Sequence, residues 1–541
     1  MTLDGMQAES PTNATRLNAE GVAARVNGWL GAHQRLYLAA VSLFCVLTFA
    51  GYARVRFMVT DECLELTIIR LAGLRQIWSA LFDGVQVDPP MLDSAMHVLF
   101  RLIGDSLFLA RLPSVLCFCM LCVCLAKIVW RYAPPTYAAA TFFLPFATIL
   151  RGYASIARPY APMLGFSALT LLCWDSMQNA VGSRQIRWRI AFLVSLTVTL
   201  STHFYSILIL VPLGLGELAK WKFYSRPDRL AILCMALALV PYCLSIPILV
   251  SASHIFGPHF AYRVEFQTLY DFFGSMLISL PWAVIVLLLC FARASSSATP
   301  AEMPRKGPAS QELRVMLVVS GGFLLLPFCG YIGGVLFTGY FAPQYYMAAV
   351  FGLILGLPLL PPALGSSREV VGLCLFLAMA VHGLFVGTRG VSGFLRAERP
   401  YPALSEVRRL IPEPHPDIVV SALVHFLPFY EATKSDPENN LLYLFDPRKQ
   451  LAEYGNDTAD VSARIMVGRT PARIVPFDPY VATHRRFFIL SVAEVLGIVG
   501  VQEWQFKYLL KTLHARLLWL GNVRGFDLYQ VDLPALAADA K

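Results

Sequence analysis

Charged residues are scarce in this sequence. Asp, Glu, Lys and Arg make up 15% of the 541 residues, whereas about 25% is usual for soluble proteins. Hydrophobic residues account for 57%, and they come in blocks long enough to cross a hydrocarbon core of about 30 Å. A soluble chain of this length would need far more charged surface. The composition therefore excludes a soluble globular protein and indicates an α-helical polytopic membrane protein.

Several motifs of covalent and redox chemistry are also missing. No cysteine follows Cys374, so disulfides do not report the compartment of the C-terminal region. Cys119 and Cys122 have C-x-x-C spacing but lie in an apolar run without a His or acidic partner, which is typical of cysteines that pack as small hydrophobic residues. The absence of a Ser/His/acid or Cys/His motif argues against covalent acyl transfer. The absence of an internal repeat argues against a transporter built from repeated halves.

The net charge of +9 is explained by topology rather than by nucleic-acid binding. Most of the excess lies in short loops between apolar segments, and the basic loops alternate, as cytoplasmic loops do. This pattern places the N-terminus in the cytoplasm and requires an outer turn at His203. The sequence predicts eleven spans, near residues 36–53, 111–130, 137–150, 160–176, 190–202, 204–219, 230–250, 271–292, 314–336, 344–361 and 370–388.

Three regions are expected. Residues 1–35 form a cytoplasmic tail, 36–392 a transmembrane domain, and 393–541 a small extracytoplasmic α/β domain. The first outer loop, 54–110, carries seven acidic residues. Its stretches 62–82 and 91–103 mix apolar and charged residues at helical spacing, which predicts helices lying in the membrane interface. In the tail, the pattern predicts strands at Asp417–Ser421, Leu441–Phe445 and Phe487–Ser491 and a helix near Glu503–Leu513.

Ionisable and aromatic residues gather on the predicted outer side, where such groups usually face a cavity or the interface. A carboxylate there can take a proton from an acceptor hydroxyl, and an arginine can bind a phosphate with two hydrogen bonds. A second carboxylate or a histidine can hold a divalent cation such as Mg, Mn or Zn. Simpler interpretations stay open, because Glu65, Asp93 and Asp105 suit solvated helix faces or caps and outer arginines suit membrane anchors.

The order and spacing of five short motifs carry a resemblance. The motifs are Asp61-Glu62 after the first span, Asp88-Pro89-Pro90 followed by His97, Arg101 and Gly104, Arg111-Leu112-Pro113-Ser114, Tyr153-Ala154 through Arg158-Pro159-Tyr160-Ala161, and Thr202-His203-Phe204-Tyr205. Over about residues 36–390 the chain resembles the GT-C superfamily of polyprenyl-phosphate-sugar-dependent glycosyltransferases. It is most similar to the branch with bacterial protein O-mannosyltransferase-like enzymes, lipid A aminoarabinose transferases and core-sugar transferases of rhizobial lipopolysaccharide.

The resemblance implies a membrane enzyme that moves a sugar from a polyprenyl-phosphate donor to an acceptor hydroxyl at the extracytoplasmic face. In that family the first acid of the acidic pair is the proposed base, so the resemblance assigns catalysis to Asp61 and Glu62. The residues expected to bind the donor phosphate are Arg111, Arg151, Arg158, Tyr153 and Tyr160. The residues expected to bind substrate or a metal are Asp88, His97, His203 and Tyr340, with Asp88 and His203 as the cation ligands.

Two departures from the family pattern affect these expectations. Ser155 and Ile156 stand where the family has a polar or acidic residue before the arginine. Gly339-Tyr340 stands where the family has Arg-Tyr, so Arg158, Arg151 or Arg111 would have to bind the donor phosphate instead. The family branch indicates a bacterial inner membrane and an envelope glycan such as lipopolysaccharide, and it leaves a glycan, a lipid or a protein as the acceptor.

Two other functions remain in competition with the enzyme. One is a transporter or flippase of lipid-linked sugars, and the other is a non-catalytic envelope assembly protein that presents the α/β domain. The enzyme hypothesis makes a structural prediction that the others do not make. Asp61, Asp88, Arg158 and His203 should converge on one cavity at the outer interface.

Overall fold

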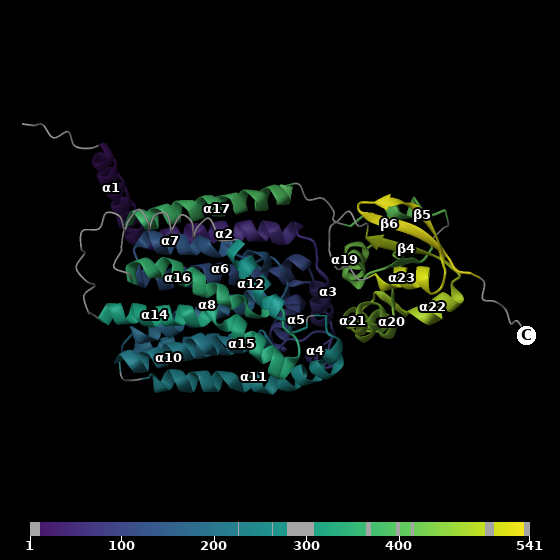
Figure 1. The fold of residues 1–541 in the computed structure, drawn as a ribbon, viewed down its shortest axis with the longest axis horizontal. Coiled ribbons are helices and arrows are strands. Elements are labelled where there is room, and N and C mark those ends of the chain that lie inside the picture. Colours follow the sequence, from purple (N-terminus) through teal and green to yellow (C-terminus); the bar gives the residue numbers. More distant parts are fainter. Residues whose placement is uncertain are drawn as a thin grey trace, which may run out of the picture.

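The computed structural model describes residues 11–224, 227–261, 263–278, 308–363, 369–395, 401–412, 416–492 and 503–534. Long helices run side by side along the long axis of the molecule, and an α/β domain lies at one end (Figure 1). Helix α1 (Pro11–Ala32) lies at the opposite end. Three shorter helices, α3 (Thr60–Ile69), α4 (Leu74–Phe82) and α5 (Met91–Ile103), lie where the long helices meet the α/β domain.

The helical part contains twelve further described helices. They are α2 (Gln34–Val55), α6 (Leu107–Tyr132), α7 (Pro135–Phe143), α8 (Tyr160–Gln178), α9 (Ser183–Leu200), α10 (Leu210–Tyr224), α11 (Arg229–Phe256), α12 (Phe266–Ile278), α14 (Pro308–Leu324), α15 (Leu326–Gly333), α16 (Val350–Ala363) and α17 (Glu369–Leu395). Short 3₁₀ turns extend some of them, at Leu144–Ala147, Ile149–Tyr153, Phe204–Ile209, Gly257–His259 and Pro343–Ala349, and a π-helical turn follows at Gly334–Thr338.

The protein is a multi-pass membrane protein. Seven helical stretches in the described part of the chain are long and apolar enough to cross a membrane; they are Gln34–Val55, Leu107–Tyr132, Phe204–Tyr224, Arg229–Phe256, Gln311–Thr338, Pro343–Pro361 and Glu369–Ser392. The predicted count of eleven is not confirmed. Helix α7 has only 9 residues before it breaks into 3₁₀ turns, helices α8 and α9 do not meet the same criterion, and the expected span at 271–292 lies partly outside the described residues.

Small residues allow the long helices to approach one another closely. Helix α8 packs against both α6 and α9. A Cβ atom on Gly165 of α8 would come within 2.5 Å of the backbone oxygen of Cys117 in α6, so only glycine fits at this crossing. Such contacts favour helix association in lipid, where apolar surface alone gives little driving force.

The first outer loop folds as its pattern predicts. Helices α4 and α5 each bury one apolar face, which includes Ile77 and Leu81 in α4 and Met96 and Phe100 in α5. Pro90 precedes α5, and Gly104 ends it with a φ of 122°, a backbone conformation that favours glycine. The predicted stretch 91–103 therefore matches α5, whereas 62–82 is divided into α3 and α4.

The C-terminal domain is a six-stranded mixed sheet covered by helices on both faces. The strand order is β3-β2-β1-β4-β6-β5, with the first four strands parallel and the last two antiparallel to their neighbours. The strands are β1 (Ile418–Val420), β2 (Leu441–Phe445), β3 (Arg473–Pro476), β4 (Arg486–Val492), β5 (Arg516–Val523) and β6 (Phe526–Asp532), and the helices are α18 (Leu404–Arg408), α19 (Leu423–Thr433), α20 (Pro447–Tyr454), α21 (Thr458–Met466), α22 (Phe477–Thr483) and α23 (Trp504–Lys511).

Alternate residues of the central strands enter two separate hydrophobic cores. Ile418 and Val420 of β1 pack in one core, and Val419 packs in the other. This two-residue period is the ordinary consequence of strand geometry. The predicted strands near β1, β2 and β4 and the predicted helix near α23 are thus confirmed, while β3, β5 and β6 were not predicted.

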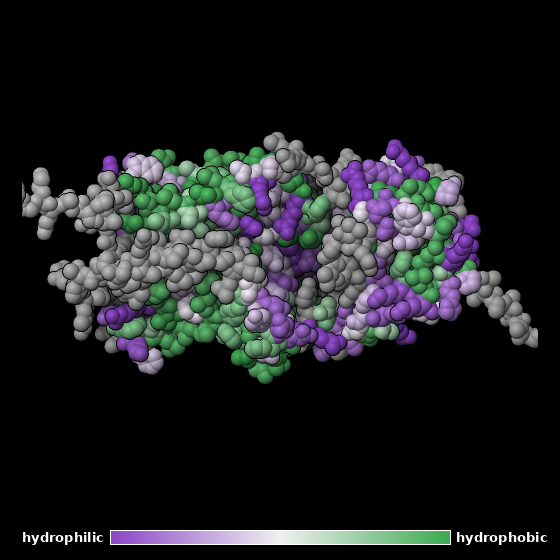
Figure 2. Space-filling model, turned by 45° about the horizontal axis from the view of Figure 1, so that its top comes forward, coloured by the Kyte–Doolittle hydropathy of each residue, from purple (hydrophilic) through white to green (hydrophobic). Residues whose placement is uncertain are grey.

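Polar contacts join the C-terminal domain to one end of the helical part. Hydrophilic residues gather at this boundary, where the surface is hollowed (Figure 2). The contacts link Thr60 to the carbonyl of Val424, Arg70 to Glu431, Arg469 to Asp83, and the backbone N–H of Ala261 to Thr458. The α/β domain therefore contacts both the loop 54–110 and the segment after α11.

Candidate functional site

Asp61 lies in the first turn of α3. This helix begins at Thr60, and Glu62 accepts a hydrogen bond from the backbone N–H of Val59 at 3.1 Å, which satisfies one of the free N–H groups at a helix start. A carboxylate in this turn also interacts favourably with the helix dipole. The side chain of Asp61 is 56% exposed, whereas Glu62 is fully buried. The two adjacent acids therefore have different surroundings.

Arg158 brings three carboxylates together. Its guanidinium lies 3.7 Å from Asp61, 3.5 Å from Glu65 and 4.0 Å from Asp88, and its side chain is only 11% exposed. Asp61 and Glu65 are four residues apart and so share one face of α3. The expectation that Glu65 is a solvated residue is wrong, because its side chain is 4% exposed.

Gln86 and Asp93 complete the buried side of this cluster, and sequence reasoning missed both roles. The amide of Gln86 donates to Glu65 at 2.5 Å and to Asp88 at 3.1 Å. Asp93 is 1% exposed, so it is not the solvated residue or simple cap that was expected. Burial, and then the neighbouring Glu65, raise the pKa of Asp93 above its ordinary value. We refer to Asp61, Glu65, Asp88, Asp93, Gln86 and Arg158 as the Arg158 cluster.

His203 adjoins the Arg158 cluster through Asp88. It lies at the break between α9 and the next 3₁₀ turn, as predicted, and its Nε2 is 3.6 Å from Asp88 Oδ1. The backbone N–H of Tyr205 donates to His203 Nδ1 at 3.1 Å. A neutral imidazole that accepts at Nδ1 carries its proton on Nε2. His203 therefore directs an N–H group toward Asp88.

Burial changes the titration of this site. It raises the pKa of Asp88 to about 7, with the positive charge of Arg158 opposing the shift. Burial and then Arg158 lower the pKa of His203 to about 3. Burial alone would lower the pKa of Arg158, but Tyr160 and the carboxylates of Asp61, Asp88 and Glu65 raise it overall. At neutral pH the site therefore holds a charged arginine and a neutral histidine, and the pKa of Asp88 lies near 7.

Aromatic rings form a wall beside His203. Tyr160 accepts a hydrogen bond from Arg158 at 3.3 Å, and its ring lies 5.5 Å from that of His203. Tyr345 lies 5.2 Å from His203 and stacks on Tyr205 at 4.5 Å. Tyr340 is 6.1 Å from Tyr345, and its buried hydroxyl has no hydrogen-bond partner among the described residues. The structure thus places the predicted Tyr160 against Arg158 and Tyr340 farther along the same wall.

Glu62 and Arg111 form a separate, fully buried pair. Arg111 donates to Glu62 twice at 2.7 Å and to the carbonyls of Ala53, Arg56 and Phe57. A guanidinium has five N–H donors, and all five are used here. Glu62 and Arg111, expected in catalysis and in phosphate binding, are thus both fully buried, and every N–H donor of Arg111 is used within the protein.

Three other predicted site residues lie away from the Arg158 cluster or only beside it. Arg151 is exposed and lies near Tyr52 and His382 instead. Tyr153 reaches the cluster indirectly, with its ring 5.2 Å from that of Tyr160. His97 is buried and its Nδ1 pairs with the carbonyl of Ile69 at 2.8 Å, so it joins α5 to the end of α3.

The expected cation site does not fit this geometry. Asp88 and His203 would be its ligands, but a neutral histidine binds metal through a nitrogen lone pair, and His203 Nε2 carries the proton. Arg158 also lies 4.0 Å from Asp88, where its charge opposes a cation. Within the described ranges, no group of three His, Cys, Asp or Glu side chains could hold a metal ion. Asp88 and His203 are therefore better described as a close pair, with His203 Nε2 3.6 Å from Asp88 Oδ1, than as the ligands of a divalent cation.

Two described cavities lie on different sides of α3. A space of about 10 Å³ borders Glu65 and Arg158, which is room for about one water molecule. A larger cavity of about 370 Å³ lies between α3, the start of α6 and α19. Asp61 and Arg158 do not line the larger cavity, so the size of a cavity alone does not identify the reactive site.

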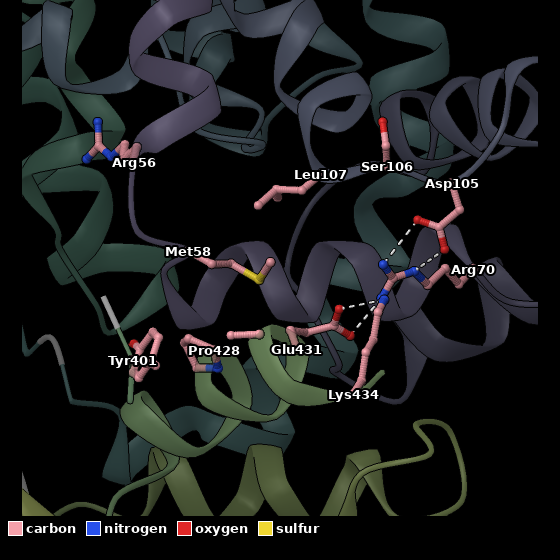
Figure 3. A pocket seen from close by; sticks show the side chains of 11 residues that line it. Arg56, Met58, Arg70, Asp105, Ser106, Leu107, Tyr401, Pro428, Glu431 and Lys434 are labelled. Carbon is pink, nitrogen blue, oxygen red and sulfur yellow. Dashed lines mark hydrogen bonds and ion pairs between the residues drawn. The ribbon is translucent and has the colours of Figure 1, made fainter. Parts of the chain in front are cut away.

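The larger cavity is closed at one end by ion pairs that were not predicted. Arg70 pairs with Asp105 and with Glu431, each at 2.7 Å, and Lys434 pairs with Glu431 at 2.9 Å. In Figure 3 these side chains point toward one another at one end of the cavity, and Arg56 lies at the other end. The cavity therefore marks the contact between the C-terminal domain and the outer loop.

Comparison with solved structures finds two structures of one protein with a similar fold. One is the crystal structure of ArnT from Cupriavidus metallidurans bound to undecaprenyl phosphate. The matched region covers 93% of this chain and 98% of the ArnT chain, with 16% sequence identity and a TM-score of 0.42. The other is the apo structure of the same protein. There the matched region covers 94% of this chain and 98% of the ArnT chain, with 16% sequence identity and a TM-score of 0.43. No protein-family model matches the chain, and no curated protein matches it.

Proposed function

We propose that this protein transfers a sugar from a polyprenyl-phosphate donor to an acceptor hydroxyl at the outer membrane–water boundary. The observation that carries the proposal is the convergence of Asp61, Asp88, Arg158 and His203 where the long helices meet the C-terminal domain. Asp61 and Asp88 come from the loop 54–110, and Arg158 and His203 come from two later segments of the chain. The motif resemblance supplies the reaction class, and the geometry supports a division of labour among the residues.

Asp61 is proposed as the general base. It is 56% exposed, whereas Glu65 and Asp88 in the same cluster are 4% and 7% exposed. An acceptor arriving from water can therefore contact Asp61 without opening the protein core. A carboxylate within hydrogen-bond reach of a hydroxyl typically contributes about 10²–10⁴-fold to such a reaction.

Arg158 is proposed to hold the departing phosphate. Its ion pairs are loose, at 3.5–4.0 Å, and its Nε has no hydrogen-bond partner among the described residues. A well-made charged pair has N···O distances of about 2.7–2.9 Å, so Arg158 keeps capacity for a stronger anion. Tyr160 steadies the guanidinium through a hydrogen bond and through its ring, 5.3 Å away.

The proposed step is an inverting displacement. The acceptor oxygen attacks the anomeric carbon while Asp61 takes its proton. The bond between that carbon and the phosphate oxygen breaks, and its electron pair leaves with the polyprenyl phosphate beside Arg158. Asp88 sets the local charge beside the neutral His203, and the donor's prenyl chain lies along the apolar helices. The proposal also places the protein in a bacterial inner membrane. The site then lies at the extracytoplasmic face, and the N-terminus lies in the cytoplasm.

The test is sugar release from a panel of polyprenyl-phosphate sugars, measured for the wild-type protein and for Asp61→Asn. Asp478→Asn is the matched control, because Asp478 is also an exposed acid, 67% exposed, and pairs with Lys449 in the C-terminal domain. We expect release by the wild type and by the control and a loss of about 10³-fold in Asp61→Asn. Full activity in Asp61→Asn would remove Asp61 as the base. No release from any donor by folded wild type would favour the transporter or assembly function instead.

A further inference from the structure

The Glu62–Arg111 pair lies beside the Arg158 cluster, and both of its side chains are fully buried. We infer that Glu62 and Arg111 are positioning residues that fix the carboxylate of Asp61 relative to the guanidinium of Arg158. This inference rests on the proposed function for its catalytic consequence. Its structural part, the placement of one side chain against the other, stands independently and can be measured without turnover.

Glu62 connects the two segments that carry the proposed reactive groups. It is the direct neighbour of Asp61 in α3, and its Oε1 accepts a hydrogen bond from the backbone N–H of Ala157 at 2.7 Å. Ala157 is the direct neighbour of Arg158. One carboxylate therefore holds both backbones, although 95 residues separate them in the sequence. Any shift of Glu62 must change the 3.7 Å separation of Asp61 and Arg158.

Arg111 fixes Glu62 in turn. The carboxylate receives four hydrogen bonds, two from Arg111 and one each from the backbone N–H groups of Val59 and Ala157. Paired charge-assisted bonds of this kind restrict orientation as well as adding energy. The remaining donors of Arg111 hold the backbone carbonyls between α2 and α3. The start of α3 thus has almost no freedom to move relative to α6.

Ser114 adds a second support one helical turn after Arg111. Its hydroxyl donates to the carbonyl of Ile156 at 2.6 Å, so α6 holds the segment before Arg158 directly through Ser114 and indirectly through Arg111 and Glu62. The position of the guanidinium is therefore set by α6 and α3 and not by its own loose ion pairs. This explains how Arg158 can keep long contacts to three acids and still have a defined place.

A matched control exists at the other end of the helical part. Glu217 in α10 is also a buried carboxylate, 5% exposed, which accepts from Lys220, from the indole of Trp174 and from the backbone N–H of Asp228. Glu217→Gln and Glu62→Gln each place an amide NH₂ where a carboxylate accepted several donors. Both should lower thermal stability, because buried donors lose their acceptor. Only Glu62→Gln should change the geometry of the Arg158 cluster.

The first measurement needs no enzymatic activity. In an Asp61→Cys protein, the rate of iodoacetamide alkylation at position 61 is followed by peptide mass spectrometry, with fragmentation to separate it from Cys63. A nearby cation favours the reactive thiolate, so adding Arg158→Gln should slow alkylation by about threefold or more. Glu62→Gln should slow it similarly, and Glu217→Gln should leave it unchanged. An unchanged rate in Glu62→Gln or in Arg158→Gln would overturn the inference.

The second measurement uses turnover of folded, purified protein below the melting temperatures of all variants. Misplacement of reacting groups by about 1 Å can cost about 10²-fold, so Glu62→Gln should lower kcat by about that factor while Glu217→Gln lowers it little. In an Asp61→Asn background, Glu62→Gln should cause no further loss, because the group it positions is already gone. Equal losses in both backgrounds would show a purely structural role. Alkylation as expected without turnover in the wild type would reject the proposed function but keep the positioning role.

Discussion

Arg111 and Arg158 are both buried, both paired with acids and only about 50 residues apart in the sequence, but their surroundings differ. Arg111 uses every N–H donor at 2.7–3.1 Å, and its partner Glu62 is equally saturated. Arg158 faces three carboxylates at 3.5–4.0 Å. The first arrangement is complete and suits a structural support. The second has unused bonding capacity and suits a group that must accept a ligand.

The difference also appears in the charge balance. One acid faces Arg111, which makes a neutral pair. Several acids surround Arg158, and burial raises the pKa of Asp88 to about 7 and that of Asp93 above its ordinary value. Burying charge without full compensation costs stability, and groups with shifted pKa values are common at functional sites. A stable fold alone would not require this arrangement.

The largest expected effect separates the two arginines by activity. Arg158→Gln should lower sugar transfer by about 10³-fold, because removal of a preorganised donor to developing charge costs about that much. It should also weaken donor use more than acceptor use, which is checked by titrating each substrate separately. Folding should change little, since the surrounding acids can take up protons. Unchanged donor affinity would contradict the assignment of Arg158 to the phosphate.

The reverse outcome is expected for Arg111. Arg111→Gln leaves Glu62 as a buried, uncompensated charge, which typically costs about 3 kcal/mol or more. The measurement is the free energy of unfolding in detergent, with Arg158→Gln as the comparison. Arg111→Lys keeps the charge but loses the forked geometry, so it should recover part of the loss. If Arg111→Gln were as stable as Arg158→Gln, the structural role of the buried pair would be wrong.

The sequence predicted the four residues that the structure brings together, because motif order on the outer side marks which helix ends must meet. It also predicted the outer-loop helices, whose amphipathic pattern is strong. Glu65 could have been found, since it is four residues after Asp61 on the same helix. Gln86 carried no signal, because a glutamine in a loop is ordinary until its two carboxylate partners are known.

The buried surroundings of Arg111 and Glu62 could not be predicted from the sequence, and the reason is physical. An arginine that binds phosphate and one that binds a buried glutamate look the same in a sequence, because both follow outer-face motifs and both carry one charge. Only the count of satisfied donors distinguishes them, and that count depends on the carbonyls of Ala53, Arg56 and Phe57. The surroundings of the expected cation ligand His203 could not be predicted for a similar reason, since its Nδ1 accepts from the backbone N–H of Tyr205.

A smaller effect tests the charge balance of the Arg158 cluster. The pKa of Asp88 rises from 3.8 to about 7 on folding, so the folded protein binds a proton that the unfolded chain releases. Stability from this group is therefore present below about pH 4 and is lost as the pH rises toward 7. Asp88→Asn removes this penalty. At about 1.36 kcal/mol per pKa unit, its advantage over wild type should be roughly 2 kcal/mol larger at about pH 8 than at about pH 5.5.

Thermal unfolding of both proteins at the two pH values checks this prediction. His203 is present in both, so the effect of its lowered pKa largely cancels in the difference. Asp478→Asn serves as an exposed control and should show no pH-dependent advantage. An Asp88→Asn protein that gains nothing at high pH would mean that the carboxylate is fully compensated, as Glu62 is, and the contrast between the two regions would weaken.

Arg70 provides an intermediate case and the smallest expected effect. It makes close ion pairs, like Arg111, but its side chain is 25% exposed, and its partners come from the outer loop and from the C-terminal domain. Partly exposed pairs contribute about 1 kcal/mol or less, so Glu431→Gln should barely change global unfolding. It should instead increase hydrogen exchange where α3 and α19 meet, because it loosens the contact of the α/β domain with the outer loop. Lys434→Gln, which leaves Arg70 paired, should not. Faster exchange throughout the protein, and not only at this junction, would show that Arg70 is a structural support of the same kind as Arg111.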